Sequence, residues 1–160
     1  MMDMSLAIIA LVAWLVMIVF VLVPKWLTLT DIFFLYFIVG IMTVSLFTLL
    51  DVNLHWVPVT RKVEKSLALD LCRFIIIPLL VIMAAGILNS PLRAGWRWTI
   101  GLVILVILVA DDWMMIRLAL IDFRQWTFLN SFLMYVVFIM VMAWIARWFV
   151  RLDRGGLRQP

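Results

Sequence analysis

Two neighbouring carboxylates, Asp111 and Asp112, interrupt an otherwise apolar stretch of this chain. A charge in the middle of a membrane costs about 2.5 to 3.5 kcal/mol on insertion scales, so such groups are expected to find a partner or face water. Adjacent carboxylates repel each other, and consecutive helical residues point about 100° apart. Only one of the two can therefore face a given partner squarely, and the other is the candidate proton or cation site.

Charged residues of opposite sign lie at matching depths on two neighbouring predicted helices. Counted from the turn that joins the two helices, Arg73 lies about 24 Å along the first, and Asp111 and Asp112 lie about 21 to 23 Å along the second. The same count gives about 28 Å for Asp70 and about 30 Å for Arg117. We predict two crosswise ion pairs, Arg73 with Asp111 or Asp112, and Asp70 with Arg117.

The last predicted helix contributes two further polar side chains. Counted from Gln125, Asn130 lies about 7 Å along it and Tyr135 about 15 Å, close to the depth of Asp112. The predicted intramembrane polar cluster is therefore Asp70, Arg73, Asp111, Asp112, Arg117, Asn130 and Tyr135. It either holds three helices in register or, through its spare carboxylate, binds a proton or cation.

Metal and redox chemistry find little support in the sequence. An acidic motif that holds Mg²⁺ against a diphosphate needs a further acid at close helical spacing, but Met115 and Ile116 stand there. The chain has one cysteine, Cys72, and one histidine, His55, too few for a disulfide or a metal site built by this chain. We predict no catalytic residue, no metal and no cofactor.

The elements that must position these residues are five long apolar stretches. A membrane-spanning helix needs about 20 apolar residues. The expected helices are 4–23, 32–50, 60–88, 96–121 and 126–150, followed by a polar tail at 151–160. The third is the least certain in sequence terms, because its most apolar part, 74–88, is short and contains Pro78. Four spans with one re-entrant or interfacial helix are the alternative.

Composition excludes a water-soluble domain. Of 160 residues, 68% are apolar and 14% are charged, more apolar surface than a chain of this size can bury. The fold class is therefore an all-α, polytopic integral membrane bundle forming one domain over 1–160. Soluble enzymes, disordered tails and disulfide scaffolds are excluded. The net charge of +4 does not indicate nucleic acid, because the basic residues flank apolar runs.

Location and orientation follow from the flanking charges. The hydropathy profile is similar to that of many small multi-pass bacterial proteins, which favours a bacterial plasma membrane. Lys25 follows the first span and only Asp3 precedes it, so we expect the N-terminus outside and the C-terminus in the cytoplasm. Expected partners are membrane lipids and a membrane protein or a second copy of the chain.

Three functional classes remain at this point. The leading prediction is a non-enzymatic accessory or structural membrane component with a charge-paired core. The alternative is a proton- or cation-coupled transporter or channel that uses Asp111 and Asp112. A lipid-modifying membrane enzyme, with its acids at the membrane boundary, is the third.

Overall fold

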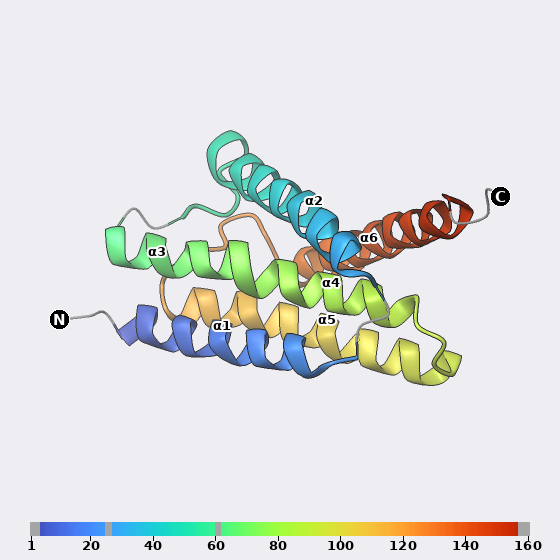
Figure 1. Cartoon of the computed structure of the whole chain (residues 1–160). Helices are drawn as coiled ribbons and strands as arrows, with labels where there is room; N and C mark the ends of the chain where they lie inside the picture. The colour runs from blue at the N-terminus through green and yellow to red at the C-terminus, as the bar shows by residue number, and fades with distance from the viewer. Residues whose placement is uncertain (1–3, 25–26, 60–61, 157–160) are drawn as a thin grey trace.

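The computed structural model consists of helices that pack side by side, and it describes residues 4–24, 27–59 and 62–156, with side chains up to 151 (Figure 1). Five helical stretches are long and apolar enough to cross a membrane: Met4–Leu22, Leu29–Asn53, Val63–Leu88, Ala94–Arg117 and Phe128–Arg151. The predicted all-α membrane bundle with five spans is confirmed. Thr60, within the start of the predicted third helix, and Lys25, used for orientation, lie outside the described residues.

The third candidate span is one continuous helix, long and apolar enough to cross a membrane, which favours five spans over the alternative with one re-entrant or interfacial helix. It comprises α3 (Val63–Leu71), the π-helical segment η2 (Cys72–Ile76) and α4 (Ile77–Leu88). We call Val63–Leu88 the central helix. In its most apolar window, 61% of the residues are buried, more than in any other span. The sequence suggested a weak span because Pro78 interrupts the pattern, but the helix continues through it.

The central helix has this burial because the other four helices pack around it (Figure 1). α1 (Met4–Leu22) contacts α3, η2 and α4, while α2 (Leu29–Thr48), α5 (Ala94–Arg117) and α6 (Phe128–Gly156) all contact α4. α6 also touches α2 and α5. α1 and α2 are neighbours in sequence, yet each uses the central helix as a principal partner.

Pro78 leaves a carbonyl that a neighbouring helix satisfies. Proline has no backbone N–H, so the Phe74 carbonyl four residues earlier loses its usual α-helical donor. In a membrane an unpaired carbonyl is costly, because lipid offers no hydrogen bond. The Tyr36 hydroxyl on α2 donates to the Phe74 oxygen at 2.6 Å. This hydrogen bond joins α2 to the central helix at the π-helical segment.

Two helix boundaries differ from the prediction for local reasons. α2 begins at Leu29 rather than 32, because Thr28 and Asp31 form a capping box in which each side chain accepts from the other's backbone N–H. α5 ends at Arg117 rather than 121, since Ala119 adopts a left-handed backbone conformation with φ of 52°. Ile121 then forms an isolated antiparallel bridge with Val59.

The first helix is close to its predicted range, whereas the last helix continues beyond it. α1 matches the expected 4–23 to within one residue. α6 begins at Phe128 and continues to Gly156, so the predicted polar tail at 151–160 is helical through most of its length. Residues 157–160 lie outside the described residues.

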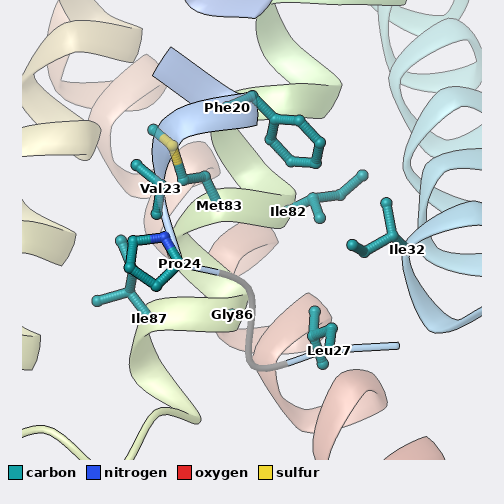
Figure 2. Close-up of a pocket in the computed structure, with 9 residues that line it drawn as sticks. All are labelled: Phe20, Val23, Pro24, Leu27, Ile32, Ile82, Met83, Gly86 and Ile87. Carbon is teal, nitrogen blue, oxygen red and sulfur yellow. The ribbon is translucent and has the colours of Figure 1, made fainter. Parts of the chain in front are cut away.

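A small apolar space in the bundle is too small to be a ligand site. It lies where the end of α1 and the following segment meet α2 and α4, with Pro24 and Leu27 near Gly86 (Figure 2). Its lining is entirely apolar and its accessible volume is about 20 Å³. That is room for about one water molecule, and no polar side chain is present to hold it.

Candidate functional site

The buried face of α5 carries both carboxylates into the protein. Its buried residues are Ile104, Leu105, Leu108, Asp111, Asp112 and Met115, a stripe with the spacing of a helix packed on one side. Two consecutive residues are buried at positions 104 and 105, and two more are buried seven residues later, at Asp111 and Asp112. Both acids are therefore buried, at 5% and 3% exposure. We expected only one of the two to face a given partner squarely, and Asp112 alone has a hydrogen-bond partner among the described residues.

Asp112 is held by α6. The Tyr135 hydroxyl donates to Asp112 Oδ1 at 2.9 Å, and Tyr135 itself is 1% exposed. Ser131, one helical turn earlier, lies within hydrogen-bonding reach of Asp112. The Trp126 Nε1 atom donates to Ser131 Oγ at 2.8 Å. Asp112 thus ends a polar chain that begins in the segment between α5 and α6.

Asp111 has no such support. Neither of its carboxylate oxygens is exposed, and neither has a hydrogen-bond partner among the described residues. Its electrostatic neighbour is Asp112, a like charge. An ionised carboxylate in this position would be buried, unpaired and beside another acid, which is the costliest state for such a group. The geometry therefore favours Asp111 as a neutral, protonated carboxyl.

Cys72 is the residue of the central helix that faces this pair. It is fully buried at the start of η2 and lies close enough to feel the charges of Asp111 and Asp112. A thiol is a weak hydrogen-bond donor and acceptor, and it supplies no positive charge. We call Asp111, Asp112, Ser131, Tyr135 and Cys72 the acid cluster.

The predicted ion pair between Arg73 and the aspartates does not form. The guanidinium of Arg73 lies 4.4 Å from the centre of the Phe47 ring on α2, and its electrostatic neighbours are Asp70 and Asp51. Arg73 follows Cys72 by one residue and so points to a different side of the helix. It faces α2 instead of α5.

The second predicted pair, between Asp70 and Arg117, is also absent from the described part of the chain. Arg117 is exposed, with its guanidinium 5.0 Å from the centre of the Trp113 ring one turn earlier on α5. Asp70 is half-buried and lies near Arg73, three residues along the same helix. The helix count used for the prediction does not determine which way each side chain points.

Asn130 is not part of the acid cluster. It lines an open groove between α2 and α6 together with Trp56 and Trp126. The α6 residue that joins Tyr135 at the carboxylates is Ser131, which sequence reasoning missed. A usable signal was present, because Ser131 and Tyr135 are four residues apart and share one face of a helix, whereas Asn130 and Tyr135 do not.

Comparison with protein-family models, curated proteins and solved structures found no match to this chain. Within the described residues, no group of three or more His, Cys, Asp or Glu side chains is arranged to hold a metal ion. What the acid cluster offers is a buried pair of carboxylates, one supported by hydroxyl groups and one unsupported. That arrangement can hold and release a proton.

Proposed function

We propose that this chain is a non-enzymatic, multi-pass membrane component whose core binds one exchangeable proton at Asp111 and Asp112. The observation that carries the proposal is the unpartnered, buried carboxyl group of Asp111. With one proton shared between the acids, Asp112 remains the acceptor for Tyr135, and Asp111 contributes no uncompensated charge. A buried group of this kind tends to take up a proton rather than stay ionised.

A proton is a better occupant than a metal ion in this proposal. Among the described residues, the polar side chains that interact with the pair from other helices are Tyr135 and Ser131 on α6 and Cys72 on the central helix. Mg²⁺ and Ca²⁺ prefer about six or more oxygen ligands, which this set does not supply. No arginine or lysine among the described residues lies against the acids to hold both of them ionised.

The proton would arrive from the nearer membrane surface. Asp112 lies five residues before the end of α5, about 8 Å along the helix axis. Trp126 in the connecting segment donates to Ser131 on α6, and Ser131 lies within hydrogen-bonding reach of Asp112. In the proposed orientation, with the C-terminus in the cytoplasm of a bacterial cell, this surface faces outward. The component would then respond to the pH outside the membrane.

Infrared spectroscopy of the purified full chain tests the proposal directly. A protonated carboxylic acid in an apolar site has a C=O stretch separate from that of a carboxylate. We expect this band at neutral pH in the parent chain and its loss in Asp111→Asn. Asp122→Asn, an exposed acid in the segment after α5, is the matched control and should leave the band unchanged. A band absent from the parent, or unaffected by Asp111→Asn, would overturn the proposal.

Proton transport is the second candidate, favoured by the π-helical segment beside the acids. η2 begins at Cys72, which faces the pair, and single-turn π segments often occur at functional sites. A shift of that segment could open a path towards the other membrane surface. Proteoliposomes with an internal pH dye and an imposed membrane potential test this. Transport predicts a proton flux that Asp112→Asn abolishes, whereas the accessory role predicts no flux in either chain.

A further inference from the structure

The opposite end of the bundle holds a second polar cluster, made of basic residues. A pocket of about 350 Å³ lies between the end of α4, the start of α5 and the last part of α6. Its lining includes Leu88, Arg97, Trp98, Met140, Trp144 and Arg147. Trp98 and Trp144 are 61% and 71% exposed. Exposed tryptophan beside arginine is typical of the level of the lipid headgroups.

Neutral groups position both arginines. Arg97 Nη1 donates to the carbonyl oxygen of Leu88 at 3.3 Å, and Arg147 Nε donates to Asn89 Oδ1 at 3.1 Å. Asn89 is itself fixed, because its Nδ2 atom donates to the carbonyl oxygens of Ala85 and Ala143 at 2.9 Å each.

The positive charges of this pocket have no counter-ion among the residues that the structure describes. No acid among the described residues pairs with either arginine, and the buried Nε atom of Arg97 has no hydrogen-bond partner there. Each guanidinium retains N–H groups that are free to bind an anion. Guanidinium groups suit phosphate well, because their planar fork matches two of its oxygens.

An apolar groove continues from this pocket along the seam between α5 and α6. It shares Leu88, Trp98 and Met140 with the pocket, encloses about 340 Å³ and extends to Leu105 and Phe132. Arg97 and Leu105 are eight residues apart, so the groove runs about 12 Å into the apolar part of the helix. Gly101 lies in its wall, and a side chain added there would contact Leu88, which also lines the groove.

We propose that this pocket and groove form a binding site for an anionic phospholipid. The phosphate lies between Arg97 and Arg147, and one acyl chain occupies the groove between α5 and α6. A free phosphate would use the arginines but not the groove, whereas a neutral lipid would use the groove and leave the pair of positive charges without a net counter-charge. Only an anionic lipid satisfies both parts of the site.

Native mass spectrometry of the full chain in a neutral detergent tests the headgroup contact. The probes are phosphatidylglycerol and phosphatidylcholine with the same acyl chains. We expect the parent to favour phosphatidylglycerol, and Arg97→Gln with Arg147→Gln to bind it about tenfold more weakly. Arg93→Gln with Arg151→Gln makes the same change in net charge outside the pocket and should retain the parent affinity. Equal weakening in both double variants would overturn the proposal in favour of diffuse charge attraction.

A variant in the groove separates a lipid from a free anion. Gly101→Leu fills the groove and should reduce phosphatidylglycerol binding several-fold, while Gly40→Leu on α2, where the added side chain meets open space, should not. Inorganic phosphate should not compete at concentrations that match the lipid. If phosphate competes fully and Gly101→Leu binds normally, the site is a simple anion site and the lipid proposal fails.

A charge-conserving variant keeps the test usable if the glutamine variants do not fold. Arg97→Lys with Arg147→Lys retains both positive charges but loses the planar fork. Phosphatidylglycerol binding several-fold weaker than in the parent supports direct contact with the phosphate. An unchanged affinity would show that the arginines do not hold it.

Discussion

The two ends of the α5 and α6 pair carry side chains of opposite charge type, acids at one end and arginines at the other. Near one end of the α5 and α6 seam lies the acid cluster, with two buried carboxylates and no described basic partner. At the other end lie Arg97 and Arg147, with no described acidic partner. The charges are segregated along the seam instead of being paired across it. Under the two proposals above, the acid cluster takes a proton from outside the chain and the arginine pocket takes an anion.

The largest expected effect distinguishes the two adjacent acids. Asp112→Ala leaves the buried Tyr135 hydroxyl without its acceptor and should lower the free energy of unfolding by about 3 kcal/mol. Asp111→Ala removes a group that has no partner, so its loss should be much smaller or absent. Chemical denaturation in detergent measures both. Equal losses would mean that the two carboxylates are supported alike and that the asymmetry of the pair is wrong.

At the basic end, the corresponding test is at Asn89. Asn89→Leu removes the link to the Ala143 carbonyl on α6 and the acceptor for Arg147 Nε, at an expected cost of about 2 kcal/mol. Asn89→Asp keeps an acceptor for Arg147 but cannot donate to Ala143. It should therefore fall between the parent and the leucine variant in thermal unfolding. An aspartate variant less stable than the leucine variant would contradict this account of the basic end.

Away from the α5 and α6 seam, a neutral hydrogen bond joins α2 to the central helix. Tyr36→Phe should cost about 1 kcal/mol, because it leaves the Phe74 carbonyl without a donor. Pro78→Ala supplies the missing backbone N–H, so the tyrosine substitution should become nearly neutral in that background. A double-mutant cycle measures this coupling. Additive effects would show that the hydroxyl does not replace the amide lost at Pro78.

The smallest expected effect concerns a lysine near the acid cluster. Lys65 Nζ donates to the Leu118 carbonyl oxygen at 3.1 Å, capping the end of α5 instead of pairing with the aspartates. Lys65→Met should cost about 0.5 kcal/mol in unfolding measurements, without changing the infrared signal of the carboxyl groups. Lys62→Met, an exposed position on the same helix start, is the control. A changed carboxyl signal would show that Lys65 acts on the acids.

The sequence was sufficient to predict the membrane class, the five apolar helices and the common level of Asp112 and Tyr135. Depth depends only on the rise per residue, so Asp112 and Tyr135 could be placed at one level by counting. Direction around the helix depends on which faces pack together, and counting does not supply it. For this reason Cys72 faces the acids, while its neighbour Arg73 faces α2.

One further feature was readable from the sequence, and two others were not. The capping box at Thr28 and Asp31 was readable from the sequence as a helix start, but Asp31 was instead interpreted as a boundary. The left-handed residue that ends α5 is Ala119, and alanine gives no local signal for that conformation. The central position of the third helix depends on contacts between distant segments, which one sequence does not reveal.

The central helix also sets the order in which the bundle can be assembled. The ribosome makes α1 and α2 before Val63–Leu88 exists, so the two earliest spans enter the membrane without the surface on which both of them pack. Until the third span is made, the two helices lie in lipid without the central helix as their packing partner. The arrival of the third span gives them a common scaffold, and α5 and α6 then close the remaining sides. Biogenesis of this protein should therefore be most vulnerable while its first two spans await the third.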